Sequence, residues 1–413
     1  MATYYTRVTM TEPDAPHSSL LFSVTRSYRA LPRSIWVLGF VSMLMDVSSE
    51  LIHSLLPIYM SMLGASMMTI GLIEGIAEST TAITKVFSGV ISDYFRVRKL
   101  IVVAGYGLAA ITKPIFPLAT SIGWVFGARF VDRIGKGIRG APRDALIADI
   151  TPAELRGAAF GLRQALDTVG AFIGPLLAVA LLLLLADDLR KVMWIAAIPA
   201  FLAVALLFVA VKEPASSASS TVNRLTWRDA GQLSTRYWFV VILGATFTLA
   251  RFSEAFLILR AQNVGLDIAY VPVIMIVMNI VYATLAYPLG EAADRMPAQP
   301  LLVIGLVLLI IADIVLALAT SPWMTFVGAA FWGLHMAFTQ GLLSKLIADT
   351  APATLRGTAF GVFNLVSGIA LLFASVIAGA LWTQFGASAT FYAGAGFAAI
   401  AAMGLMVYRY EAR

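Results

Sequence analysis

Cysteine is absent from the 413 residues, and the chain contains only three histidines. The lack of cysteine excludes disulfides, thiolate metal sites and a cysteine nucleophile, and so few histidines make a multi-histidine metal centre improbable. Charged residues are also scarce: they form 13% of the chain, against roughly 25% in an average soluble domain, whereas 60% of the residues are hydrophobic. This apolar surplus is too large for a water-facing exterior, so we predict an all-α membrane protein without metal or cofactor.

Apolar stretches of the length that a helix needs to cross a bilayer, about 20 residues, recur between residues 34 and 408. Breaks at proline, glycine and charge clusters predict twelve transmembrane helices near 34–61, 66–94, 98–118, 121–148, 157–186, 190–211, 237–262, 269–294, 299–320, 322–349, 358–383 and 386–408. The only long polar interruption within them predicts the following division: a tail at 1–33, a six-helix bundle at 34–211, a linker at 212–236, a second six-helix bundle at 237–408 and a tail at 409–413.

The distribution of lysine and arginine predicts how the helices are oriented. The net charge is +6, and the cations gather in alternate short loops and in both tails. Such loops face the cytoplasm, so both termini are expected there, in a protein of the inner or plasma membrane. Other cations lie inside apolar segments, and neither placement resembles a nucleic-acid-binding face.

An internal repeat supports two related halves. The segment LIADITPAELRGAAFG begins at Leu146 and LIADTAPATLRGTAFG begins at Leu346, so 12 of 16 positions agree at an offset of 200 residues. Repeated halves around a central pathway are typical of transporters, whose substrate site lies near the bilayer midplane between the halves.

At these residues the sequence resembles the major facilitator superfamily, over essentially the whole chain after residue 33. The segment GVISDYFRVRK resembles the family's loop signature, with Gly89, Asp93, Arg98 and Lys99 in place, although Arg96 replaces the usual glycine of the turn. The resemblance implies two six-helix bundles, secondary transport of a small molecule by a monomer, no enzymatic activity, and a conformational role for these residues.

A second segment, GAFIGP, resembles a signature of proton-coupled exporters in this superfamily. It contains Gly170, Gly174 and Pro175 on the fifth predicted helix. Small residues four apart also let helices pack closely and proline kinks a helix, so simple packing is the alternative interpretation.

The fourth predicted helix resembles the family's arginine-bearing signature in two registers. Counting back from Asp149 selects Arg129, whereas a local RxxxGxxxA pattern selects Arg133. The resemblance implies that this arginine supports proton coupling or a hydrogen-bond network in the cavity, and both candidates stay open.

Ionisable residues at bilayer depth mark functional pathways by default, because they are costly in lipid. Asp46, Glu50 and His53 share one face of the first predicted helix. Two carboxylates one turn apart repel each other when both are ionised, so we expect one of them to take up and release protons. A structural network with basic residues of adjacent helices is the alternative. Glu254, which follows Ser253 as Glu50 follows Ser49, is the expected counterpart in the second half.

The remaining candidates are polar residues that we expect around a substrate cavity. They are His53, Glu74, Lys85, Lys136, Arg163, Asp167, Arg251, Asn279, Tyr282 and His335. Arg129, Arg133, Lys136, Arg139 and Arg143 fall within an arc of about 120° on one helix. Such an excess of cations either attracts an anionic cargo or balances carboxylates on other helices.

The sequence therefore predicts proton-coupled export of a small organic molecule, which is anionic if the cations bind it, across a lipid bilayer. Proton symport that imports an organic anion or a metal chelate such as a siderophore is one alternative. A membrane sensor or scaffold that transports nothing is another. No phosphate-binding loop for ATP is present among the motifs.

Overall fold

The computed structural model describes residues 30–95, 98–152, 155–211, 233–295, 297–352 and 355–407, and within them it is helical without any strand. The helices that precede residue 212 are α2 (Arg33–His53), α3 (Leu56–Met62), α4 (Met67–Phe95), α5 (Arg98–Thr112), α6 (Ile115–Leu118), α7 (Ile122–Ile150), α8 (Arg156–Leu184) and α9 (Leu189–Ala210). Those that follow are α11 (Thr235–Ala250), α12 (Ala255–Asn263), the 3-10 turn η2 (Ile268–Tyr270), α13 (Val273–Arg295), α14 (Ala298–Ala317), α15 (Pro322–Thr350), α16 (Arg356–Phe385) and α17 (Ala387–Val407).

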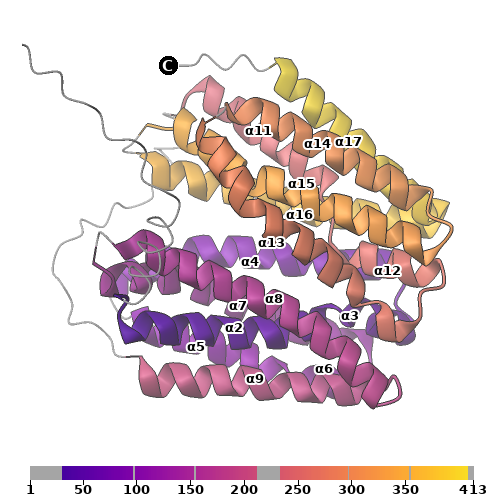
Figure 1. The fold of residues 1–413 in the computed structure, drawn as a ribbon, viewed down its shortest axis with the longest axis horizontal. Coiled ribbons are helices and arrows are strands. Elements are labelled where there is room, and N and C mark those ends of the chain that lie inside the picture. The colour runs from indigo at the N-terminus through magenta and orange to yellow at the C-terminus, as the bar shows by residue number, and fades with distance from the viewer. Residues whose placement is uncertain are drawn as a thin grey trace, which may run out of the picture.

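The helices from the two parts of the chain form two neighbouring groups (Figure 1). Helices α2 to α9 pack mainly against one another, as do α11 to α17, and the groups meet chiefly where α4 crosses α16 and α8 crosses α13. The predicted tails and linker fall largely on residues 1–29, 212–232 and 408–413, which lie outside the described ranges.

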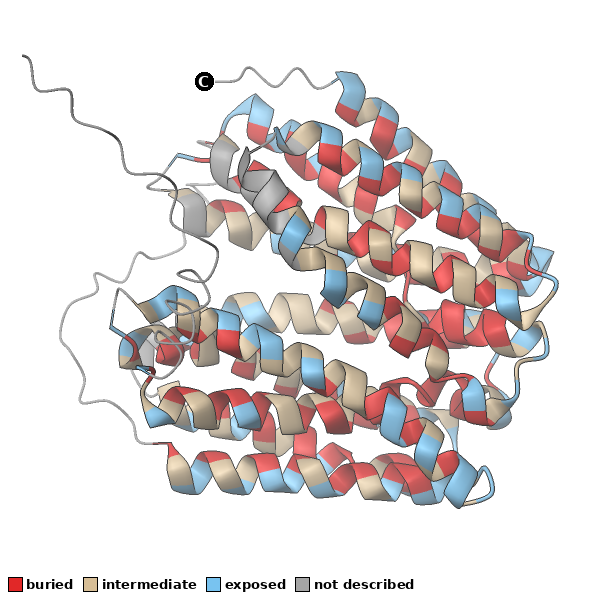
Figure 2. Cartoon of the chain, viewed as in Figure 1, coloured by how far each residue is buried: buried red, intermediate tan, exposed pale blue. Residues whose placement is uncertain are grey.

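Nine helical segments among the described residues are long and apolar enough to cross a membrane. In Figure 2, exposed residues occur along the whole length of the outer helices. Large apolar side chains such as Phe208 and Trp323 are among the exposed residues, so water is a poor solvent for this exterior. Helices α4, α7 and α15 are not among the nine, although each has 29 residues. At about 1.5 Å per residue they too are long enough to span the bilayer.

Three of the helices predicted as continuous are each broken into two α-helices. The helix predicted at 98–118 ends as α5 at Thr112 and resumes as α6 at Ile115, with Lys113 and Pro114 between them. The helix predicted at 34–61 ends at His53 and resumes at Leu56, because Pro57 lacks an N–H and its ring clashes with the carbonyl one turn earlier. The helix predicted at 237–262 is interrupted at 251–254 between α11 and α12, where the Ser253 N–H donates to Ser375 Oγ at 3.2 Å.

The internal repeat forms the same local structure twice. In the first copy α7 ends at Ile150 and α8 begins at Arg156, and in the second α15 ends at Thr350 and α16 begins at Arg356. The Leu155 N–H donates to Pro152 O, as that of Leu355 donates to Pro352 O. The sequence repeat is therefore a structural repeat of a helix end, a turn and a helix start.

Candidate functional site

The two groups of helices enclose a cavity of about 540 Å³ between them. A second cavity of about 430 Å³ shares four lining residues with it, namely Glu50, Lys136, Ala171 and Asn279. The second cavity continues toward the end of the molecule that holds the repeated turns, since Arg139, Arg143 and Asp167 line it. The volumes suit a small organic molecule, because ligand pockets typically have about 300 to 1,000 Å³.

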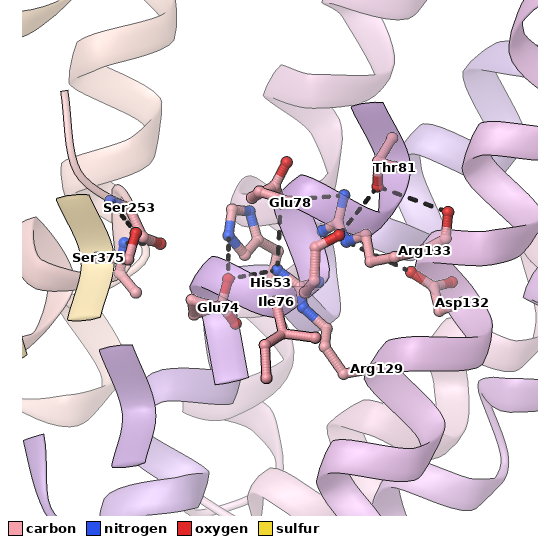
Figure 3. A network of polar contacts seen from close by, with 12 residues as sticks. His53, Glu74, Ile76, Glu78, Thr81, Arg129, Asp132, Arg133, Ser253 and Ser375 are labelled. Carbon is pink, nitrogen blue, oxygen red and sulfur yellow. Dashed lines mark hydrogen bonds and ion pairs between the residues drawn. The ribbon is translucent and has the colours of Figure 1, made fainter. Parts of the chain in front are cut away.

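Both candidate arginines of α7 form ion pairs with carboxylates of α4 (Figure 3). The Arg129 Nη2 atom lies 2.7 Å from Glu74 Oε2, and the Arg133 Nη1 atom lies 3.3 Å from Glu78 Oε1. The first pair is sealed from the cavity, with the Arg129 side chain 2% and that of Glu74 0% exposed. The second borders the cavity, since Glu78 and Arg133 line it.

His53 connects the cavity to this network. Its Nδ1 atom lies 3.3 Å from Glu50 Oε2, and its Nε2 atom lies 3.9 Å from Glu74 Oε2. Glu50 and His53 line the cavity, whereas Glu74 lies behind them. The imidazole thus stands between Glu50, which faces the cavity, and Glu74, which is paired with arginine. Figure 3 shows the contact of His53 with Glu74. A neutral imidazole can accept a proton on one nitrogen while it donates from the other.

Lys113 is a charged residue of this region that the sequence did not single out. Its Nζ atom lies 2.8 Å from Asp132 Oδ1 and 3.1 Å from Ser49 Oγ. The Lys113 and Asp132 side chains are 2% and 6% exposed. Lys113 comes directly after the end of α5 and before Pro114. A lysine beside a proline inside an apolar stretch was the available signal.

Glycines of the GAFIGP segment bring α8 against the face of α2 that carries the carboxylates. A Cβ atom at Gly174 would lie 2.8 Å from Val47 O and 2.9 Å from Glu50 Cβ. One at Gly170 would lie 2.7 Å from Met43 O and 3.0 Å from Asp46 Cβ. These two glycines therefore hold α8 directly behind Asp46 and Glu50.

Gly174→Ala is expected to destabilise the protein by roughly 1 to 3 kcal/mol, because the added methyl group overlaps the α2 backbone and has no flexible side chain to displace. The measurement is the midpoint of unfolding of the purified protein in detergent. The matched control is Gly127→Ala on α7, where nothing lies within 4 Å of a Cβ and alanine favours the helix. Equal midpoints for the two variants would contradict the close approach of α8 to α2.

The second-half wall of the cavity is built around the break between α11 and α12. Arg251, Ser253 and Glu254 line the cavity from this segment. Neither Arg251 nor Glu254 has an ion-pair partner within 4 Å in the described part of the chain. Asn279 of α13 also lines it and donates to Ala171 O of α8 at 3.4 Å. A broken helix at a cavity between two halves is a recurring form of substrate site in transporters.

Other predicted cavity residues are placed in three ways. Lys85, Asp167 and Tyr282 line the second cavity. Arg163 lies between Asp144 and Asp167, at 3.2 and 3.6 Å. His335 is buried beside Gly305 O and Phe247 and lines neither of the two cavities described above.

The loop signature lies at the end of the molecule that holds the repeated turns. Arg98 at the start of α5 pairs with Asp149 near the end of α7, and Lys99 donates to Phe208 O at 3.2 Å. The side chain of Asp93 lies outside the described residues, so its predicted conformational role stays a prediction.

Asp313 on α14 is a second ionisable residue that the sequence did not single out. Its side chain is fully buried, and neither carboxyl oxygen has a hydrogen-bond partner among the described residues. The sequence feature that could have indicated Asp313 is a single aspartate within a strongly apolar helix.

Comparison with known proteins identifies the family of this chain. The Major Facilitator Superfamily profile matches residues 38–281 and 239–413. The chain is 34% identical to an uncharacterised MFS-type transporter of Methanocaldococcus jannaschii, over 86% of this chain and 89% of that protein. It is 26% identical to the inner membrane transport protein YajR of Escherichia coli K12, over 89% and 81% of the two chains. A solved structure of a mutant of the nucleoside transporter NupG superposes with a TM-score of 0.77 at 15% identity, over 91% of this chain and 99% of that chain.

The molecule is thus a membrane transporter rather than an enzyme. The chain belongs to the Major Facilitator Superfamily, which confirms the resemblance stated above. The superposition at 15% identity concerns the fold alone.

Proposed function

We propose that this protein is a secondary active transporter that works by alternating access and couples the movement of a small organic molecule to protons. We further propose twelve spans in two six-helix bundles, at 34–211 and 237–408, and a monomer in the inner or plasma membrane with both termini in the cytoplasm. The observation that carries the proposal is the Glu50 and His53 contact of 3.3 Å at the wall of a cavity between the two groups of helices.

Proton coupling is supported by the position of the titratable groups. Glu50 and Glu254 line the same cavity from opposite groups of helices, and Asp46 lines its continuation. We assign Glu50, with Asp46, as the first proton site and Glu254 as the second. His53 extends this site toward Glu74, and a chain of such groups can pass a proton between the cavity and the protein interior.

Export in exchange for protons is favoured over symport by the GAFIGP segment. Its glycines pack α8 against Asp46 and Glu50, so movement of α8 during a change of conformation would displace the proposed proton site. The segment that resembles the signature of proton-coupled exporters thus contacts the proposed proton site directly.

The ion pairs between α7 and α4 reduce the number of α7 cations that can bind an anionic cargo. Arg129 and Arg133 are engaged by Glu74 and Glu78, which favours a role in balancing carboxylates. Lys136 lines both cavities. We therefore assign attraction of an anionic group to Lys136 rather than to the two arginines.

The test is proton flux in proteoliposomes that contain the purified protein and an internal pH dye. Small aromatic amines, carboxylates and amino-carboxylates are added outside under an imposed pH gradient. Flux of protons opposite to a compound supports antiport, and flux in the same direction supports symport. Transport of compounds at an unchanged rate when the gradient is removed would contradict proton coupling, and lack of transport for the entire panel would contradict the cargo class.

A further inference from the structure

We infer that the cavity binds an amphoteric aromatic molecule, whose cationic group lies at Glu254, whose anionic group lies at Lys136 and whose ring lies on the aromatic wall of the second half. The inference rests on the proposed function only in taking this cavity as the cargo site. It goes further in naming the chemical class of the cargo and the residue that receives each of its charges.

The charges that line the cavity are balanced in number. Glu50, Glu78 and Glu254 supply three carboxylates, and Arg133, Lys136 and Arg251 supply three cations, with His53 as the seventh ionisable group. The cavity thus has no net excess that would select a cargo of one sign. A cargo that carries both signs matches it.

Among the charges that line the cavity, Lys136, Arg251 and Glu254 have no ion-pair partner within 4 Å in the described part of the chain. Arg251 and Glu254 come from the same break between α11 and α12, so Lys136 is the one unpartnered charge of the three on the first-half side. Arg133 pairs with Glu78, and Glu50 contacts His53. Lys136 lines the cavity from α7, and Glu254 lines it from the break between α11 and α12.

A charge without an ion-pair partner is stabilised by water in an open cavity, and it destabilises the closed state when water is excluded. When alternating access shuts the cavity and water leaves, an uncompensated charge is strongly destabilising because nothing solvates it. A cargo with a single charge would compensate either Lys136 or Glu254 and leave the other bare. An amphoteric cargo compensates both, one from each group of helices, and so favours the closed state.

The apolar part of the lining lies on the second-half side. Phe247, Phe252 and Phe363 line the cavity together with Met275. Aromatic rings and a polarizable thioether favour an aromatic ligand body. The cargo body therefore belongs beside Glu254, and its anionic end reaches across to Lys136.

The experiment measures binding to the full-length protein in lipid nanodiscs, by calorimetry and without a pH gradient. The probes are 4-(aminoalkyl)benzoates with one to four methylene groups between ring and amine, which scan the separation of the charges. Each is compared with the phenylalkylamine and the alkylbenzoate that retain only one of its charges. We expect at least one amphoteric probe to bind ten times more tightly than either of its singly charged counterparts. Equal affinities within every set, or no binding of any probe, would overturn the inference.

Two substitutions assign the charges. Glu254→Gln is expected to weaken binding of the amphoteric probe and the amine at least tenfold and to leave the benzoate unchanged. Lys136→Gln is expected to weaken the amphoteric probe and the benzoate and to leave the amine unchanged. The matched control is Lys191→Gln in the exposed first turn of α9, where the lysine pairs with Asp188.

The two substitutions can also contradict the assignment. If Arg251→Gln weakens binding of the benzoate and Lys136→Gln does not, Arg251 receives the carboxylate of the probe and the role given to Lys136 is wrong. If amphoteric probes bind more tightly and both substitutions act as expected, but the protein shows no proton flux, the inference stands and the proposed proton coupling is wrong. If only singly charged compounds produce proton flux, the proton coupling stands and the inference is wrong.

Discussion

Glu50→Gln is expected to abolish accumulation of cargo driven by a pH gradient, with a loss of at least tenfold, while exchange of cargo without a gradient stays largely intact. The amide keeps the size of the carboxyl and its contact with His53, which lies 3.3 Å away, but it cannot take up a proton at any physiological pH. The measurement compares gradient-driven uptake and counterflow in proteoliposomes, using the panel compound that gives the wild-type protein its largest proton flux.

The matched control replaces a carboxylate by an amide far from the cavity. Asp188 caps α9 by accepting a hydrogen bond from the Lys191 N–H, and asparagine caps a helix about as well as aspartate. Asp188→Asn should therefore leave both rates near those of the wild-type protein. A Glu50→Gln protein that still concentrates cargo with normal pH dependence would remove Glu50 from the coupling mechanism and leave Glu254 as the candidate.

Much of the fold follows from local features of the sequence. Apolar stretches place the helices within a few residues, and the repeated segment places two equivalent junctions, between α7 and α8 and between α15 and α16. These features are readable because they depend on neighbouring residues along one chain. The break at 251–254 was not predicted, because that segment contains no proline or glycine.

The partners of the charged residues depend on how helices are rotated against one another, and no local pattern encodes this. Five cations on one face of α7 indicate an unusual helix, but they do not distinguish an anionic cargo from carboxylates of α4. The structure resolves this for Arg129 by placing it on Glu74. Likewise, the contact of Asp132 with Lys113 depends on the packing of α5 on α7, which the sequence does not encode locally.

The contact between Arg129 and Glu74 gives the largest expected effect on stability. Arg129→Gln leaves Glu74 as a fully buried carboxyl without its nearest cation. Breaking a buried ion pair from one side typically costs about 3 to 5 kcal/mol, because the remaining charge is uncompensated. We expect the free energy of unfolding to fall by this amount. The measurement is a denaturant titration of the purified protein in detergent.

The double variant Arg129→Gln with Glu74→Gln tests the cause of that loss. It removes both charges and retains similar side-chain volumes, so it should recover most of the stability lost by Arg129→Gln alone, as expected of a coupled pair. Binding of the benzoate probes should be unchanged in both variants, because Arg129 lies behind the cavity wall and Lys136 faces the cavity. If Arg129→Gln instead weakens benzoate binding tenfold without loss of stability, the arginine binds cargo. The anion site would then belong at Arg129, and Glu74 would have to be balanced by another group such as His53, whose Nε2 atom lies 3.9 Å away.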